Sequence, residues 1–329
     1  MVRVAILDDY QQKALEAADW SVLPSDTQVT AFKDHLFDEV ALAERLKDFD
    51  VVIGMRERTP FRRSLLEQLP DLKLLMTTGM GNASYDFEAA TELGIPIAGT
   101  SMAAGPVTAE LAWGLILSLV RHIPMEDAAV RLGNWQLTLG EGLFGKTLGV
   151  VGLGRLGTAV ARVGLAFQMK VLGWSMNLSP EKAAEVGVQY ATKDQLFRES
   201  DFISIHYVLS ERSRNLITAD DLALMKPTAY LINTSRGPIV NEGALIEALA
   251  QKKIAGAGLD VFDVEPLPQD HPFRRLQNTV VTPHLGYVTK EAYQGMFSNA
   301  IENIQTWLQG DPSRVINAAV LDKPNLRKS

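Results

Sequence analysis

Three polar residues in the second half of the chain, Arg236, Glu265 and His284, could do chemistry together. Each follows a short apolar run, within Asn-Thr-Ser-Arg-Gly, Asp-Val-Glu-Pro and Thr-Pro-His-Leu-Gly respectively. Histidine titrates near neutral pH, and a neighbouring carboxylate favours its protonated form, which can donate a proton to a carbonyl. The planar guanidinium of arginine suits a carboxylate. The three side chains therefore predict an acid–base site for a small molecule that carries a carboxylate.

Each of these residues alone has a simpler interpretation. A lone arginine or glutamate in a loop is usually a solvated charge, and a lone histidine is more often structural. All three residues follow expected strands and come after a glycine-rich loop in the sequence. Their occurrence together therefore favours an acid–base site. His206 also ends an expected strand, and we interpret it as structural or adjacent to a cofactor. No grouping of His, Asp and Glu in the sequence has the spacing of metal ligands.

The glycine-rich loop is residues 152–157, Gly-Leu-Gly-Arg-Leu-Gly, directly after the apolar run 148–151 and at the start of an amphipathic stretch. This strand–loop–helix context is what a dinucleotide-binding loop requires. Gly152 allows the tight turn, Gly154 lets the backbone approach a pyrophosphate, and Gly157 permits close packing of helix and strand. The start of the helix supplies N–H donors. We therefore expect a bound dinucleotide.

The choice between NAD and NADP depends on the end of the following strand. Sites that prefer NAD usually have Asp or Glu there, which accepts a hydrogen bond from the ribose 2′-hydroxyl. Here Ser175 stands at that place and Asn177 follows, so no acid repels a 2′-phosphate, and no Arg or Lys follows before Lys182. NAD(H) and NADP(H) both stay open as cofactors.

Short apolar runs alternate with amphipathic stretches along the chain, which predicts parallel strand–helix–strand units. The expected strands are 2–7, 28–32, 51–54, 72–77 and 95–98, and then 146–151, 170–174, 202–206, 229–233, 256–261 and 279–282. The expected helices are 11–19, 38–47, 62–68, 86–93, 107–122, 155–167, 179–185, 193–199, 219–224, 242–251 and 289–308. Two such series predict two doubly wound α/β domains.

The most apolar stretch, residues 103–123, raises the question of a membrane span. Its unbroken part, 111–120, is about half of the ~20 residues that a span needs. We therefore interpret 107–122 as a helix buried in a core or a subunit interface. The amphipathic helix 289–308 must also be buried, and we expect it to return to the first domain.

The composition excludes several classes of protein. The 329 residues are 47% hydrophobic and 22% charged, as in ordinary globular proteins. The net charge of −7 argues against nucleic-acid binding. The absence of cysteine excludes thiolate chemistry and disulfides and suits a reducing compartment. With no targeting signal at the start of the sequence, we expect a cytoplasmic protein.

Several segments together resemble the D-isomer-specific 2-hydroxyacid dehydrogenases. The segments are 79–90, 152–157, 233–241 (NTSRGPIVN), 258–266 (GLDVFDVEP) and 282–286 (TPHLG). The resemblance covers nearly the whole chain. It implies an α/β protein with a Rossmann dinucleotide-binding domain, residues 103–288, inserted into a discontinuous flavodoxin-like substrate domain, residues 1–102 and 289–329. It also implies a homodimer.

The resemblance implies a role for each site residue. Arg236 would bind the carboxylate and carbonyl of a 2-keto acid, His284 would exchange the proton, and Glu265 would orient His284. The substrate-carboxylate cradle would consist of Arg56 or Arg58 with the backbone of Gly79, Met80 and Gly81. The residues expected to bind NAD(H) or NADP(H) are Gly152, Gly154, Arg155, Leu156, Gly157, Ser175, Asn177, Thr234, Asp260 and Gly286.

Two functions compete with a D-2-hydroxyacid dehydrogenase. Corepressors that sense dinucleotides resemble the same family and retain the Arg, Glu and His residues, so these residues do not separate the two classes. A family member that binds NAD(P) without turnover is the third interpretation. Glu265 argues against the formate dehydrogenases of the family, which pair the histidine with glutamine.

Overall fold

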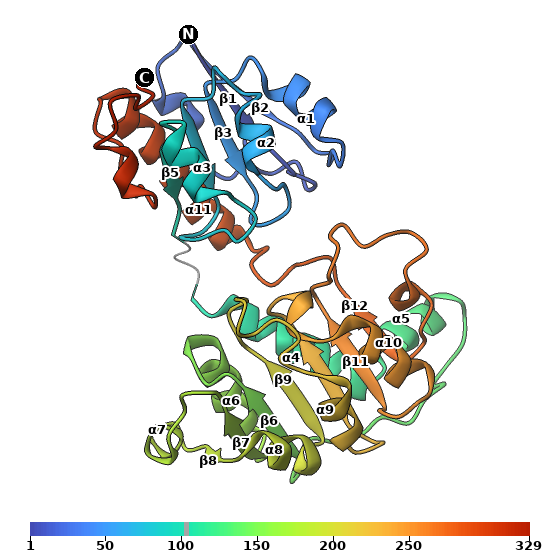
Figure 1. Cartoon of the computed structure of the whole chain (residues 1–329). Coiled ribbons are helices and arrows are strands. Elements are labelled where there is room, and N and C mark those ends of the chain that lie inside the picture. Colours follow the sequence, from blue (N-terminus) through green and yellow to red (C-terminus); the bar gives the residue numbers. More distant parts are fainter. Residues whose placement is uncertain (102–104) are drawn as a thin grey trace. The chain divides into compact units, whose positions relative to one another are not determined.

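The computed structural model describes residues 1–101 and 105–329, which form two compact units (Figure 1). Unit 1 consists of Met1–Gly105 and Thr289–Ser329, and unit 2 of Pro106–Val288. The sequence places the divisions near residues 102 and 288, and residue 102 lies outside the described residues. The functions expected of the two parts stay predictions.

Unit 1 contains a five-stranded parallel sheet with the strand order β2-β1-β3-β4-β5. This is the order of flavodoxin-like sheets. All residues of β3 and β4 are buried, as in parallel strands covered on both faces. The strands are β1 (Val2–Ile6), β2 (Thr27–Ala31), β3 (Val51–Gly54), β4 (Leu74–Thr77) and β5 (Ile97–Gly99). The helices between them are α1 (Glu39–Leu46), α2 (Arg63–Leu66) and α3 (Phe87–Glu92).

The last helix, α11 (Lys290–Leu308), packs in unit 1, beside β5 (Figure 1). Phe297 lies with its ring centroid 6.0 Å from that of Trp20. The buried Asn303 donates a 2.8 Å hydrogen bond to the carbonyl of Gly99 at the end of β5. The apolar face of α11 is therefore covered by the N-terminal part of the chain.

The helix expected over residues 11–19 does not form. The backbone of Gln12 is left-handed, with φ +55°, which interrupts any α-helix. The buried carboxylate of Asp9 instead accepts hydrogen bonds from the amides of Lys13 and Ala14. Local side-chain capping thus holds this segment in turns, and only a short 3₁₀ helix, Trp20–Val22, follows.

Unit 2 contains a seven-stranded parallel sheet with the order β12-β11-β10-β9-β6-β7-β8. The order reverses between β6 and β9, as in the Rossmann fold, and ligands bind at the carboxyl ends of strands beside such a reversal. The strands are β6 (Thr147–Val151), β7 (Lys170–Trp174), β8 (Gln189–Tyr190), β9 (Phe202–Ile205), β10 (Tyr230–Asn233), β11 (Gly256–Leu259) and β12 (Thr279–Val281). The helices are α4 (Val107–Val120), α5 (Ile123–Arg131), α6 (Arg155–Ala166), α7 (Pro180–Glu185), α8 (Lys193–Glu199), α9 (Ala219–Leu224) and α10 (Glu242–Ala250).

Helix α4 carries most of the long apolar stretch, whose residues 103 and 104 lie outside the described residues. Trp113, Leu115 and Ile116 are buried in the core that α4 shares with β6 and α6. The helix ends earlier than expected because His122 is left-handed, with φ +51°, and α5 starts after it. Within the described residues, no helix is long and apolar enough to cross a membrane.

Both sheets are entirely parallel and doubly wound, which confirms the α/β class expected from the sequence.

Candidate active site

The three residues proposed for acid–base chemistry follow three neighbouring strands of unit 2. Asn233 of β10 pairs with Leu259 of β11, which pairs with Val281 of β12, so these strands end at one level. Arg236, Glu265 and His284 come three, six and three residues later. The structure therefore delivers all three to the same edge of the sheet.

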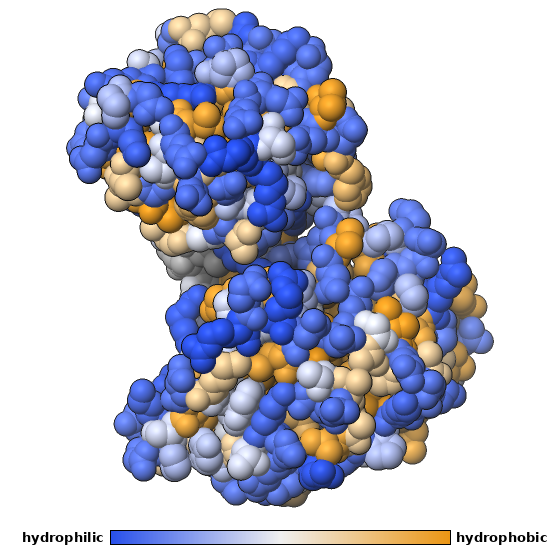
Figure 2. Space-filling view, viewed as in Figure 1, coloured by the Kyte–Doolittle hydropathy of each residue, from blue (hydrophilic) through white to orange (hydrophobic). Residues whose placement is uncertain are grey.

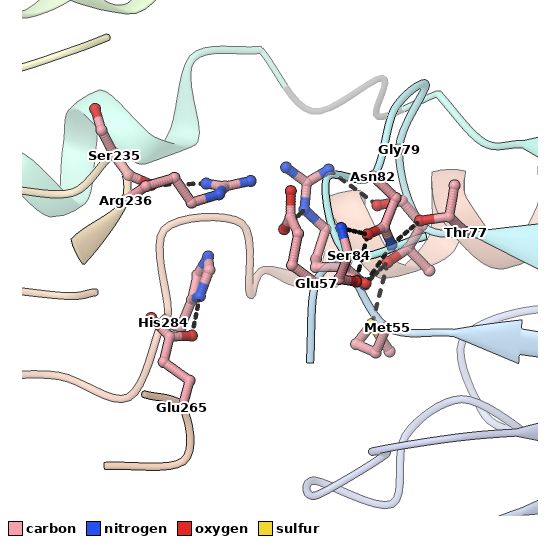
Figure 3. Close-up of polar contacts among 12 residues, drawn as sticks. Met55, Glu57, Thr77, Gly79, Asn82, Ser84, Ser235, Arg236, Glu265 and His284 are labelled. Atoms are coloured by element: carbon pink, nitrogen blue, oxygen red, sulfur yellow. Dashed lines mark hydrogen bonds and ion pairs between the residues drawn. The ribbon is translucent and has the colours of Figure 1, made fainter. Parts of the chain in front are cut away.

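His284 and Glu265 form a close pair (Figure 3). The Nδ1 atom of His284 lies 2.5 Å from Oε2 of Glu265, and the other carboxylate oxygen accepts a hydrogen bond from the amide of Phe262. His284 is only 9% exposed, and its ring meets that of Tyr287 edge to face at 5.7 Å. Because Nδ1 is occupied by the carboxylate, Nε2 is the atom that can exchange a proton with a ligand.

Asp260 organises the loop that carries His284. Its carboxylate is fully buried and accepts hydrogen bonds from the Thr282 hydroxyl and from the amides of Leu285 and Gly286. The Asp260 carbonyl accepts from the amide of His284. Burial raises the pKa of Asp260, while these hydrogen bonds and the nearby His284 favour its charged form. The expected contact of Asp260 and Gly286 with a nicotinamide stays a prediction.

Arg236 is held by a network of turns at the end of β10. The Asn233 side chain donates to the Arg236 carbonyl, and the Ser235 hydroxyl donates to the carbonyl of Ile205 at the end of β9. The Arg236 guanidinium also bonds the Ser235 carbonyl (Figure 3). A Cβ on Gly237 would lie 2.1 Å from the backbone of Phe262. Only glycine therefore lets the arginine turn pack against the loop that leads to Glu265.

The glycine-rich loop has the geometry expected for a pyrophosphate. Gly152 is left-handed, with φ +94°, and a Cβ on it would strike the His206 carbonyl at 2.3 Å. A Cβ on Gly157 would lie 1.9 Å from the Gly152 carbonyl oxygen. Gly154 faces open space, and Arg155 and Leu156 follow it at the start of α6. The loop can thus offer backbone amides to a phosphate without obstruction.

Two buried polar atoms near this loop support the fit of a dinucleotide. The hydroxyl of Thr234 and the Nδ1 atom of His206 are buried and lack a hydrogen-bond partner among the described residues. Buried polar atoms of this kind are rare in native proteins and call for a ligand or another explanation. His206 follows β9, which pairs with β6 before the glycine loop, and Thr234 follows β10, the next strand of the sheet.

The pH dependence of stability should report on His206. Burial lowers the pKa of His206 to about 4, from 6.5 for the free group, so the folded chain keeps the ring neutral between these values. The unfolded chain takes up a proton in the same window, so stability falls as the pH drops from about 6.5 to about 4. The contribution of this residue is on the order of 1–3 kcal/mol.

Urea unfolding of wild type and His206→Gln at pH 7 and pH 4.5 measures this contribution. Glutamine does not titrate, so the variant should lose less stability on acidification than the wild type. An identical loss in both proteins would contradict the assignment.

Unit 1 contains a polar cradle at the ends of β3 and β4. The Arg56 guanidinium bonds the carbonyl of Thr78, and the Asn82 side chain bonds the Arg56 carbonyl and the Thr77 hydroxyl. Gly79 has φ +134°, and a Cβ there would lie 2.3 Å from Nη1 of Arg56. The hydrogen bond between the Asn82 side chain and the Thr77 hydroxyl can be followed in Figure 3. Met80 and Gly81 complete the loop.

Arg58 points elsewhere in unit 1. Its guanidinium is buried, bonds the carbonyl of Asp8 and lies 4.7 Å from the centroid of the Tyr10 ring. The Thr59 hydroxyl bonds the carboxylate of Asp8. Arg56 thus contacts the cradle loop, and Arg58 joins its own loop to the segment after β1. The substrate role expected of these arginines stays a prediction.

Sequence reasoning missed the residues that build these loops. Thr78, Asn82 and Thr100 hold the cradle, the last through hydrogen bonds with the backbone of Gly79. Their signal is weak because Thr and Asn are common in loops. The structural role of Asp260 also depends on contacts with residues 22 to 26 positions later, which local patterns do not reveal.

Known proteins resemble this chain over most of its length. The family model described as D-isomer specific 2-hydroxyacid dehydrogenase, NAD binding domain, matches residues 113–286. A glyoxylate reductase of Thermococcus litoralis is 39% identical over 290 residues, which are 85% of this chain and 87% of that protein. A D-3-phosphoglycerate dehydrogenase of Methanocaldococcus jannaschii is 37% identical, over 87% of this chain and 55% of that protein.

A solved structure from Vibrio cholerae, titled phosphoglycerate oxidoreductase, has a TM-score of 0.89 and 37% identity, and the match covers 94% of this chain and all of that one. The chain belongs to the D-isomer-specific 2-hydroxyacid dehydrogenases. Its cofactor is therefore a nicotinamide dinucleotide, and its substrate is a small hydroxy or keto acid.

Proposed function

We propose that this protein interconverts a 2-keto acid and a D-2-hydroxy acid, with Arg236, Glu265 and His284 as its catalytic residues. The observation that carries the proposal is the pair of His284 and Glu265, which follow β12 and β11. Strand β11 lies between β12 and β10, the strand that leads to Arg236. The glycine loop follows β6 of the same sheet. Proton exchange and dinucleotide binding are thereby served by the same edge of unit 2.

Each side chain has a distinct part in the proposed reaction. Arg236 binds the carboxylate of the keto acid and polarises its carbonyl. Nε2 of His284 donates the proton to the carbonyl oxygen during reduction and takes it back during oxidation. Glu265 fixes the orientation of the ring and stabilises the charged imidazolium. The cradle of Arg56 with Gly79, Met80 and Gly81 offers a second binding place for a carboxylate.

The dinucleotide, when bound, supplies or accepts the hydride. Gly152, Gly154 and Gly157 provide the approach to its pyrophosphate, with Arg155 and Leu156 at the start of α6. The buried hydroxyl of Thr234 would gain a hydrogen-bond partner at the nicotinamide end.

A spectrophotometric screen tests the proposal. NADH and NADPH would each be combined with glyoxylate, hydroxypyruvate, pyruvate, phenylpyruvate and longer keto acids, and the absorbance of the reduced cofactor followed. Turnover of at least one keto acid, with a D-hydroxy acid as product, is the expected result. Dinucleotide binding without turnover of any acid would favour a sensing protein or a non-catalytic family member.

We also propose a homodimer formed through unit 2. Figure 2 shows hydrophobic residues along the edge of unit 2 where α5 lies. Exposed apolar side chains that gather on one face commonly mark protein interfaces. Eight large apolar side chains of α5 and the following segment are between 49% and 94% exposed, whereas Ala129 and Leu143 of the same stretch are buried. The eight are Ile123, Met125, Val130, Leu132, Trp135, Leu137, Leu139 and Phe144.

The change Leu139→Asp is expected to convert the dimer to a monomer, because Leu139 is 94% exposed in the single chain and a buried carboxylate would oppose association. Light scattering coupled to size-exclusion chromatography measures the mass. Val40→Asp, at a 71% exposed position on α1 of unit 1, is the matched control and should keep the wild-type mass. A monomeric wild type would overturn the proposal.

A further inference from the structure

The carboxyl end of β7 in unit 2 carries polar groups that the proposed chemistry does not use. Ser175 follows β7 and is half-buried, yet its hydroxyl makes no hydrogen bond with any described residue. Met176 and Asn177 are exposed beside it. In Rossmann folds this place meets the adenosine ribose of the dinucleotide. The usual contact there is a hydrogen bond from the ribose 2′-hydroxyl to an Asp or Glu. This chain has no acid at that place, so other groups must recognise the ribose.

A second loop brings a positive charge to this place. Arg212 lies in the segment after β9, and its Nη2 atom lies 3.5 Å from the sulfur of Met176. The same two segments are joined by the Tyr207 hydroxyl, which accepts a 2.9 Å hydrogen bond from the amide of Met176. The rings of Trp174 and Tyr207 stack at 6.4 Å. The position of Arg212 beside residues 175–177 is thus supported by three contacts between the segments.

The charge of Arg212 is not neutralised within the described part of the chain. The guanidinium forms no ion pair there, and a contact with a thioether is a weak hydrogen bond that a stronger acceptor would replace. Glu211, its neighbour in sequence, likewise makes no ion pair among the described residues. Glu181, at the start of α7, is engaged by the Ser179 side chain. An anion next to Ser175 would therefore meet one positive side chain and an available hydroxyl.

We propose that Arg212, together with Ser175 and Asn177, binds the phosphate on the 2′ position of the adenosine ribose, so that the chain prefers NADP(H) to NAD(H). This inference rests on one part of the proposed function, the binding of a nicotinamide dinucleotide, and does not require turnover of a keto acid. Arginine is suited to the task because its planar fork matches the oxygens of a phosphate. Ser175 donates a hydrogen bond where an aspartate would repel the phosphate.

Binding rather than turnover tests the proposal. Isothermal titration of the full chain with NADP⁺ and NAD⁺, and with the fragments 2′,5′-ADP and ADP, compares ligands with and without the 2′-phosphate. The wild type should bind NADP⁺ and 2′,5′-ADP more tightly than their counterparts. Arg212→Gln should weaken the binding of these two ligands about tenfold to a hundredfold, the value of one charge-assisted hydrogen bond, and leave NAD⁺ unchanged.

Two further variants make the test specific. Arg198→Gln removes the same charge from an exposed arginine that precedes β9, at the opposite edge of the sheet, and should change neither affinity. Ser175→Asp should reverse the preference toward NAD⁺ by repelling the 2′-phosphate and accepting from the 2′-hydroxyl.

Tighter binding of NAD⁺ by the wild type, or an equal loss of both dinucleotides in Arg212→Gln, would overturn the inference and leave the dehydrogenase proposal standing. Preference for NADP⁺ without turnover of any keto acid would uphold the inference and count against the dehydrogenase proposal.

Discussion

Replacing His284 with asparagine is expected to lower kcat for every accepted keto acid by about 10² to 10⁴, the usual contribution of a positioned acid–base group. The ring is the group whose Nδ1 is held by Glu265 and whose Nε2 is left for the substrate. Asparagine is preferred to alanine because His284 has φ +54°, and asparagine tolerates this left-handed backbone better. The loss therefore reports on the missing imidazole rather than on backbone strain.

Steady-state kinetics and dinucleotide titration should be measured on the same preparation of this variant. Dinucleotide affinity should stay within about twofold of the wild type, since His284 is not part of the glycine loop. His122→Asn is a matched control, because His122 is also left-handed, with φ +51°, and also lies in unit 2. Near-normal turnover by His284→Asn would contradict the assignment of His284 as proton donor.

Replacing Gly157 with alanine should damage the dinucleotide site through the fold. The added methyl group would lie 1.9 Å from the backbone carbonyl oxygen of Gly152, so strand β6 and helix α6 must separate. Overpacking of this kind costs about 1–3 kcal/mol or more. The variant is expected to unfold at lower urea concentration and to lose most of its dinucleotide binding.

Gly154→Ala separates stability from binding in the same loop. Gly154 has φ −86°, and an added Cβ meets no atom within 4 Å, so the variant should unfold like the wild type. Its methyl group would nevertheless obstruct the close approach of a pyrophosphate, and dinucleotide affinity should fall. Urea unfolding and titration of both variants distinguish the two effects. Equal stability of Gly157→Ala and wild type would contradict the close packing of Gly157 against the carbonyl of Gly152.

The periodicity of apolar residues was sufficient to predict most of the elements. The central parallel strands are short, buried and apolar, and several helices, such as α1 and α10, begin at a side-chain cap, so both leave local signals. Helix α8 after Thr192 and helix α9 after Thr218 have the bounds expected from the sequence. The helix predicted over 11–19 is wrong because the amides of Lys13 and Ala14 donate to the Asp9 carboxylate. The spacing of apolar residues gives no sign of these hydrogen bonds. Periodicity likewise predicts a helix that ends at His122, whereas α4 ends at Val120 because the backbone of His122 is left-handed.

The positions of Arg236, Glu265 and His284 after strands can be predicted from the sequence, because each follows an apolar run. Their proximity to one another requires the folded chain, because strand order and register depend on contacts between distant segments. Asp260 proved to hold the His284 loop, and Arg58 proved to anchor its own loop to Asp8. The sequence does not predict that Arg212 lies near Ser175, because 37 positions separate the two residues. Their loops meet because β6 pairs with both β7 and β9, which brings the ends of these strands to one edge of the sheet.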